Sequence, residues 1–262
     1  MLLVAPVLAL FGAIALSPKG HLLMRGESFW AAFAAQAQVS TPGEQALKHV
    51  TLIPGAEYPQ LQKQMRNDGY IEVPNLDIDA AALRGCKDHI ANLAHAGLPA
   101  QCVFLYGAPW VVCGHASDAL GQLFGLQSVQ DFFVFNVGPG QYGWGAHRDR
   151  GGGESRTAFG ADGLPHGVTV WIALSEASRR TSCMHVLPSF VDPHYSDVEA
   201  EEEPDPSVTL SLHHQHIRAL PAEAGTVLAW SHRLLHWGSA SPIDAPEARM
   251  VIPPHSTCLS RT

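Results

Sequence analysis

Val168-Thr-Val-Trp-Ile-Ala-Leu174 is apolar at nearly every position, and this stretch decides the class of the fold. A continuous apolar run of this length favours a strand that is buried on both faces, because a strand with one solvent face alternates apolar and polar residues. Shorter strands are predicted at residues 132–137, 184–187 and 226–230, with glycine or proline beside them. Together these strands predict a mainly β protein, either a barrel or a jelly roll.

Helices are predicted before these strands. Residues 58–69 carry apolar side chains at helical spacing and end at Gly69, a residue that commonly closes a helix. A short strand is predicted at residues 70–74, and a second helix over residues 77–93. The β fold is therefore expected to be flanked by N-terminal helices.

The composition indicates a folded globular protein. The chain has 262 residues, of which 46% are hydrophobic and 15% are charged, so it can bury a sizeable core. Residues 1–50 are expected to form an extension, and residues 51–262 a single domain. The formal net charge is −8 and no run of five lysines or arginines occurs, which argues against nucleic acid as a partner. No protein partner is indicated.

Five widely spaced cysteines form no C-x-x-C motif. This spacing excludes the usual zinc ribbons and gives no disulfide framework. We expect most of the thiols to be reduced. The alternative of one or two disulfides is left open.

Leu2–Leu16 is a run of 15 apolar residues near the N-terminus. As a helix it would span roughly 22 Å, which is short of the roughly 30 Å hydrocarbon core of a membrane. A transmembrane helix is therefore disfavoured. A signal-peptide segment fits the length, although no basic residue precedes the run, and a helix packed on the domain or on a partner fits equally well. Membrane association through this segment stays open, as does location in the cytoplasm or at a membrane or organelle.

The chemistry is indicated by His147, Asp149 and His236. Two histidines and one carboxylate form the facial triad of non-haem Fe(II) oxygenases, which leaves coordination positions open for a co-substrate and O₂. His147 and Asp149 are two residues apart, so an extended segment presents both side chains on one face. Arg249 follows 13 residues after His236, and its planar cationic fork suits a carboxylate of the co-substrate. A two-strand hairpin would return Arg249 to the side of the barrel that holds His236.

Two alternatives compete with this triad. His232 is the other candidate for the third ligand, and His236 is preferred because of its spacing to Arg249. The second alternative is a core histidine at position 147, an ion pair between Arg148 and Asp149, and an unrelated His236.

Two further polar stretches have less specific readings. His213-His214-x-His216 would place two imidazoles on one face of a strand, but no carboxylate lies near it in sequence, so a second metal site is disfavoured. The acidic run at residues 197–206 is interpreted as a solvated excursion between strands.

Five stretches, in order, resemble the phytanoyl-CoA dioxygenase family of Fe(II)/2-oxoglutarate-dependent oxygenases. The resemblance extends over roughly residues 55–255. The stretches are Tyr58–Pro74 (YPQLQKQMRNDGYIEVP), Gly145–Asp149 (GAHRD), Val170–Ala177 (VWIALSEA), Cys183–Ser189 (CMHVLPS) and Ala224–Ser239 (AGTVLAWSHRLLHWGS).

The resemblance implies a double-stranded β-helix, which is a cupin-like jelly roll, and the activity of an Fe(II)- and 2-oxoglutarate-dependent dioxygenase. His147, Asp149 and His236 would hold Fe(II). Arg249 would bind the distal carboxylate of 2-oxoglutarate, and Trp171 would line the same pocket. With O₂, such an enzyme hydroxylates a small or medium-sized organic substrate and releases succinate and CO₂. Related halogenases replace the carboxylate ligand with a small residue, so the resemblance favours hydroxylation over halogenation.

The chain departs from the family pattern around the site. Pro188-Ser-Phe190 stands where the family has a PGSH turn, and Arg148 and Arg150 flank Asp149. These arginines either form surface ion pairs or face an anionic substrate. The substrate is expected to be lipid-like or anionic. Two other functions remain open: a jelly-roll binding module without turnover, and a cupin-type metal enzyme that does not use 2-oxoglutarate.

Overall fold

The computed structural model describes residues 53–74, 76–95, 97–126, 131–149, 158–196 and 205–256. The predicted extension at residues 1–50 with its apolar run, the boundary at residue 51, Arg150 and most of the acidic run lie outside these ranges. Within them, no helix combines the length and the apolar character needed to cross a membrane. The four cysteines that they contain are free thiols.

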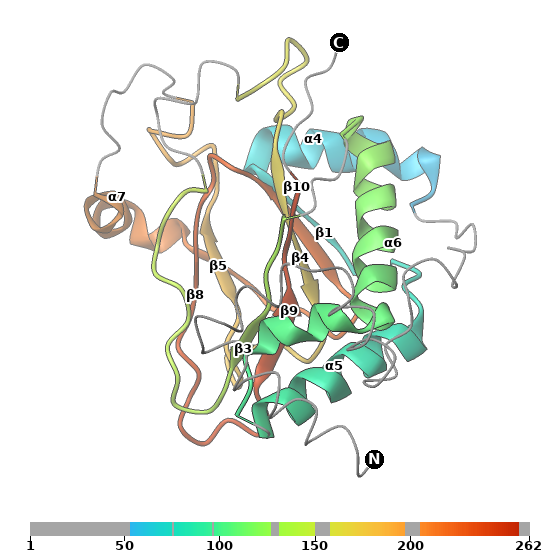
Figure 1. Ribbon diagram of the computed structural model, residues 1–262. Helices are drawn as coiled ribbons and strands as arrows, with labels where there is room; N and C mark the ends of the chain where they lie inside the picture. The colour runs from blue at the N-terminus through green and yellow to red at the C-terminus, as the bar shows by residue number, and fades with distance from the viewer. Residues whose placement is uncertain are drawn as a thin grey trace, which may run out of the picture.

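Two antiparallel sheets pack face to face (Figure 1). The larger sheet has the order β1–β7–β4–β10–β2, and β9 joins it by pairing with both β4 and β3. Its strands are β1 (Tyr70–Val73), β2 (Asp131–Phe132), β3 (Phe135–Val137), β4 (Val168–Ala173), β7 (Val227–Ser231), β9 (Arg249–Ile252) and β10 (Pro254–Ser256). The smaller sheet has the order β6–β5–β8 and consists of β5 (Met184–Leu187), β6 (Arg218–Leu220) and β8 (Leu235–Gly238). The mainly β, jelly-roll fold predicted from the sequence is confirmed.

Helices cover the outer face of the larger sheet. They are α4 (Tyr58–Asp68), α5 (Ala80–His95) and α6 (Gly107–Phe124), whereas α7 (Pro206–His213) lies beside the smaller sheet (Figure 1). Short 3-10 turns complete the set: η1 (Gly55–Glu57), η2 (Ala100–Leu105) and η4 (His214–His216). Gly69 ends α4 with a φ of 81°, a left-handed conformation that glycine adopts without strain. The helices predicted at residues 58–69 and 77–93 are present, whereas α6 and α7 were not predicted.

Strands β4 and β7 are buried at every position because their two faces meet two different cores. Val168, Val170 and Ile172 of β4 pack under the helices. Trp171 and Ala173 point the other way and pack between the two sheets. The two-residue period of a strand thus explains the unbroken apolar run in the sequence.

Two local predictions are wrong, and the histidine stretch at residues 213–216 is not extended. The strand expected at residues 132–137 is split into β2 and β3, because the strand opposite contains Pro253, which has no N–H to donate. The hairpin expected to carry His236 and Arg249 does not form, since β8 and β9 belong to opposite sheets. His214 and His216 lie in the exposed 3-10 turn η4 and not on a strand.

Candidate metal centre

His147, Asp149 and His236 converge although they come from different segments. Each residue offers one ligand atom, and the three atoms lie within 4.8 Å of one another. Oδ1 of Asp149 is 3.4 Å from Nε2 of His147 and 3.6 Å from Nε2 of His236. His232, the other candidate for the third ligand, is not part of this group.

Hydrogen bonds between the backbones of His147 and His236 fix the relative position of the two histidines. His147 N–H donates to the His236 carbonyl, and His236 N–H donates to the His147 carbonyl, both across 3.0 Å. The segment around His147 therefore lies along β8 as an isolated bridge. On its other side, β8 pairs with β5, where His236 lies opposite Val186. The fold thus brings together two ligands that are 89 residues apart in sequence.

The imidazole hydrogen bonds select the tautomer that a metal requires. Nδ1 of His147 lies 2.7 Å from the Gly145 carbonyl oxygen, and Nδ1 of His236 lies 2.9 Å from that of Leu234. A carbonyl oxygen only accepts, so each Nδ1 is assigned the hydrogen and each Nε2 keeps its lone pair. Both lone pairs lie next to Oδ1 of Asp149. Two neutral imidazole nitrogens and one carboxylate oxygen are a donor set that fits Fe(II).

The second oxygen of Asp149 is occupied by the protein. Oδ2 accepts a hydrogen bond from the Thr169 hydroxyl at 2.5 Å and another from the Trp230 indole N–H at 3.1 Å. Thr169 lies on β4 and Trp230 on β7, and the two are register partners in the larger sheet. Because both donors bind Oδ2, Oδ1 is the oxygen left for a metal.

Burial and the neighbouring charges fix the protonation of the triad. Burial alone would raise the pKa of Asp149, but the nearby His236, the contact with His147 and the hydrogen bond from Thr169 hold it well below its usual range. Burial lowers the pKa of His236 despite the opposing effect of Asp149. Burial would also lower the pKa of His147, yet the contact with Asp149 leaves it raised. An ionised carboxylate beside a neutral His236 is the state that binds a cation.

Arg249 is a buried cation in the same part of the interior. Its side chain is 2% exposed, and its Nε has no hydrogen-bond partner. Nη1 contacts Met184 Sδ at 3.9 Å, and Cζ lies 6.0 Å from the centre of the Trp171 ring. Burial lowers the pKa of Arg249 to about 10, so the guanidinium stays charged at neutral pH. Among the described residues no carboxylate forms an ion pair with Arg249, which makes it a candidate site for an anionic ligand.

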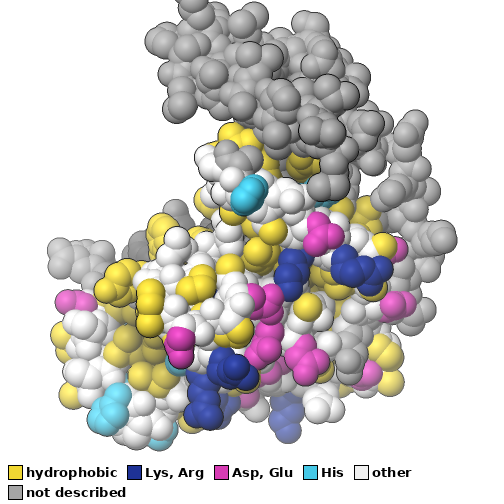
Figure 2. Space-filling view, turned by 90° about the horizontal axis from the view of Figure 1, so that it is seen from below, with side chains coloured by type: hydrophobic (Ala, Val, Ile, Leu, Met, Phe, Trp, Pro, Cys, Tyr) yellow, Lys and Arg dark blue, Asp and Glu magenta, His cyan; other side chains and the backbone are white. Residues whose placement is uncertain are grey.

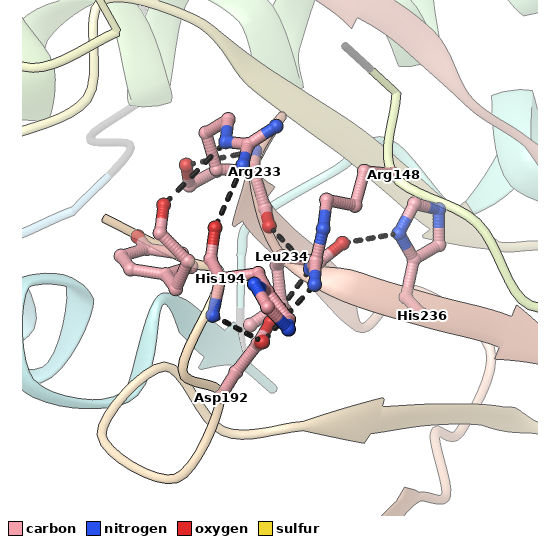
Figure 3. Close-up of polar contacts among 8 residues, drawn as sticks. Arg148, Asp192, His194, Arg233, Leu234 and His236 are labelled. Carbon is pink, nitrogen blue, oxygen red and sulfur yellow. Dashed lines mark hydrogen bonds and ion pairs between the residues drawn. The ribbon is translucent and has the colours of Figure 1, made fainter. Parts of the chain in front are cut away.

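The side chain of Arg148 is buried, which corrects the alternative of a surface ion pair. Its Nη1 and Nη2 form a two-pronged ion pair with Asp192 at 2.6 and 3.0 Å, and Nη1 also donates to the Arg233 carbonyl. The two side chains are 4% and 0% exposed. Figure 3 shows Arg148 pointing toward Asp192, with His194 and Arg233 gathered around the same turn. The partner of Arg148 is therefore Asp192, and neither Asp149 nor a substrate anion is needed to explain its charge.

Sequence reasoning missed three residues of the site. Thr169 and Trp230 lie within strands that were predicted, and the two-residue period places both on the inner face, so this face was the signal that was missed. Asp192 stands alone in a loop, with nothing in sequence to connect it to Arg148.

His232 is buried, with 6% of its surface exposed. Its backbone N–H donates to the Gly167 carbonyl at 3.3 Å, and its ring lies so close to Gly167 that an added Cβ would be 2.5 Å from Nδ1. His232 also helps to lower the pKa of Asp149.

Comparisons with known proteins identify a protein family and several structures of similar fold. A family model described as Phytanoyl-CoA dioxygenase (PhyH) matches residues 59–243. No sequence among curated proteins matches the chain. Among solved structures, the epimerase SnoN from nogalamycin biosynthesis, in complex with Fe³⁺, alpha ketoglutarate and nogalamycin RO, is similar with a TM-score of 0.56 and 18% identity. The match covers 77% of this chain and 84% of SnoN.

Two other solved structures have the same fold. The carbocyclase SnoK, also from nogalamycin biosynthesis, has a TM-score of 0.56 and 14% identity over 84% of this chain and 87% of SnoK. EctD from S. alaskensis, with 2-oxoglutarate and 5-hydroxyectoine, has a TM-score of 0.56 and 16% identity over 84% of this chain and 82% of EctD. Identities this low establish a shared fold and no more.

Proposed function

The chain belongs to the phytanoyl-CoA dioxygenase (PhyH) family, and on that premise we propose that it is a hydroxylase that uses Fe(II), 2-oxoglutarate and O₂. The substrate is a small or medium-sized organic molecule, and the co-products are succinate and CO₂. Bound Fe(II) supplies O₂ activation coupled to the oxidative decarboxylation of 2-oxoglutarate.

One observation carries this proposal: the Nε2 atoms of His147 and His236 face the same oxygen of Asp149. We assign these three residues as the ligands of Fe(II). A carboxylate in the triad supports hydroxylation over halogenation, because it occupies the coordination position that a halide would need. The hydrogen bonds from Thr169 and Trp230 keep the carboxylate in a single orientation.

We assign Arg249 as the partner of the distal carboxylate of 2-oxoglutarate. A buried guanidinium without a protein carboxylate is costly unless a ligand anion pairs with it. Trp171 supports this assignment, because its ring lies against the Arg249 guanidinium, with 6.0 Å between Cζ and the centre of the ring. The epimerase and EctD structures were obtained with alpha ketoglutarate and 2-oxoglutarate respectively, which agrees with this choice of co-substrate.

The proposal is tested by adding Fe(II) and 2-oxoglutarate to the protein without oxygen. A weak metal-to-ligand charge-transfer band is expected in the visible range. It should be absent in Asp149→Ala, whose folding is checked by circular dichroism. Succinate formation on admission of O₂ then reports turnover before the substrate is known.

The two competing functions give different results. A jelly-roll binding module without turnover would show no succinate above the level of Asp149→Ala. A cupin-type enzyme that does not use 2-oxoglutarate would bind Fe(II) but show no charge-transfer band. Either result from folded, iron-loaded protein would reject the proposed function.

A further inference from the structure

Three exposed apolar side chains lie on loops that adjoin the segments of His147 and His236. Tyr142, Trp144 and Ile243 are 88%, 61% and 83% exposed, and we refer to them as the apolar surface. They lie on two adjoining loops, at residues 138–146 and 239–248. Both loops lie at the lower end of the barrel in Figure 1, and Figure 2, seen from below, shows hydrophobic side chains gathered on this face. Exposed apolar patches of this kind usually mark a binding site.

The apolar surface reaches the metal centre through Trp144. The Trp144 ring lies edge-on to the ring of His147, with 6.2 Å between their centres, and edge-on to Phe135 at 6.1 Å. His147 is also the more exposed histidine of the triad, with 34% of its side chain exposed against 4% for His236. A molecule that lies on Trp144 is therefore next to the accessible ligand of the proposed iron.

The backbone that presents Trp144 is firmly held. Gly238 N–H donates to the Trp144 carbonyl at 3.0 Å, and Ser241 N–H donates to the Gln141 carbonyl at 2.8 Å. Gly143 approaches the other loop so closely that an added Cβ would be 2.2 Å from the Gly238 carbonyl oxygen. An exposed indole on such a fixed backbone loses little conformational freedom when a ligand binds to it.

Among the described residues, the two charged groups next to the apolar surface in sequence give no support to an anionic substrate. Arg148, the nearest described arginine in sequence, is occupied by Asp192. Asp244, beside Ile243, is exposed and acidic. An indole face favours flat apolar ring systems, on which stacking adds to the burial of area.

We infer that Trp144 is the stacking platform of the substrate site, and that the substrate is an uncharged molecule with a flat apolar ring face. This inference rests on the proposed function, because it takes the triad as the metal centre. It selects among the substrates expected from the sequence by excluding the anionic one.

A matched pair of small probes tests the inference: methyl 2-naphthoate, which is neutral, and 2-naphthoate, which has the same rings and a negative charge. Binding is measured by saturation-transfer NMR without metal. Proximity to the triad is then measured from the relaxation of the probe protons by bound Mn(II), with 2-oxoglutarate present. The neutral ester is expected to bind and to be relaxed by Mn(II), and the carboxylate to bind at least several-fold more weakly.

The variant Trp144→Ala should weaken ester binding by about ten-fold, as expected for the loss of one stacking partner. Trp144→Phe should retain most of the binding, because a ring remains. Phe190→Ala is the matched control, since Phe190 is 63% exposed and lies against Arg218 instead of a triad residue. Mn(II) affinity should be equal in all of these proteins.

Several results would overturn the inference. These are equal ester binding by Trp144→Ala and wild type, tighter binding of the carboxylate than of the ester, or a dimer that Trp144→Ala converts to monomer. The last result would make the apolar surface a self-association interface. Failure of the proposed function gives a different result. The wild-type protein would then show no Mn(II) binding or no Fe(II) charge-transfer band, while the ester would still bind in the NMR experiment without metal.

Discussion

The Trp230 indole N–H donates to Oδ2 of Asp149 across 3.1 Å, while Oδ1 of the same carboxylate faces both histidines. The ring of Trp230 also packs against that of His236, with 4.7 Å between their centres. One tryptophan near the end of β7 thus contacts two of the three proposed ligands. It fixes which oxygen of the carboxylate is available.

Replacing this indole should weaken metal binding without removing a ligand. Trp230→Phe keeps a ring beside His236 but loses the N–H donor, so Fe(II) affinity should fall by about ten-fold or more. Anaerobic titration with Fe(II) measures the change. Trp110→Phe is the control, because it also removes an indole donor, in that case to the Phe104 carbonyl, far from the triad in sequence. Equal losses in both variants would show that the effect is not specific to Asp149.

The Thr169 hydroxyl should stabilise the metal-free protein as well as orient Asp149. Thr169→Val leaves the buried carboxylate with one donor fewer, which should cost about 2 kcal/mol of unfolding free energy. Thr169→Ser keeps the hydroxyl and should stay within about 1 kcal/mol of wild type. Urea unfolding of the metal-free proteins gives both values. A Thr169→Val protein as stable as Thr169→Ser would contradict the prediction.

Arg249 should be needed for the co-substrate and not for the metal. Arg249→Met removes the charge while filling a similar volume, so Fe(II) titration should be unchanged and the 2-oxoglutarate charge-transfer band should disappear. Gly238→Ala is a milder test, because an added Cβ would lie 3.0 Å from Nη1 of Arg249 and displace the guanidinium. This variant should raise the Kd for 2-oxoglutarate by a few-fold. An unchanged Kd in Arg249→Met would reject the assignment of Arg249.

Breaking the Arg148–Asp192 pair should destabilise the fold more than breaking an exposed pair. Asp192→Asn leaves Arg148 buried without its counter-charge, at a cost of about 3 kcal/mol. The double variant Arg148→Met/Asp192→Leu should recover much of that loss, since no uncompensated charge remains. Glu247→Gln is the control: it breaks the 2.6 Å pair with Lys87, whose side chains are more than a third exposed, and should cost less than about 1 kcal/mol. Chemical unfolding compares the four proteins, and equal losses in the two single variants would contradict the prediction.

Much of the fold could be predicted because its strands have strong local signals. The run at Val168–Leu174 is apolar on both faces, and Gly69 ends a helix at the position where the chain must turn into β1. The path between elements could not be predicted in the same way. The 12 residues between His236 and Arg249 fit a hairpin, but the chain crosses to the opposite sheet instead. Sequence spacing alone does not distinguish these two connections.

The candidate site was predictable to the extent that chemistry requires rare residue types. Histidines and a carboxylate at suitable spacing indicate a metal, and the structure brings His147, Asp149 and His236 together. The partner of Arg148 was not predictable, because Asp192 is 44 residues away and any of many acidic residues was a candidate. Long-range ion pairs depend on the tertiary fold, which local patterns do not encode.

The pleat of β4 has a consequence for altering this protein by directed evolution. Val168, Val170 and Ile172 support the helical layer, whereas Thr169 and Trp171 lie on the opposite face of the strand, where Thr169 donates to Asp149. A library confined to the odd-numbered positions of this strand would sample reactivity while leaving the helix contacts intact. A library confined to the even-numbered positions would sample variants of different thermal stability. Substitutions at alternate positions of this one short strand should therefore change activity and thermal stability separately.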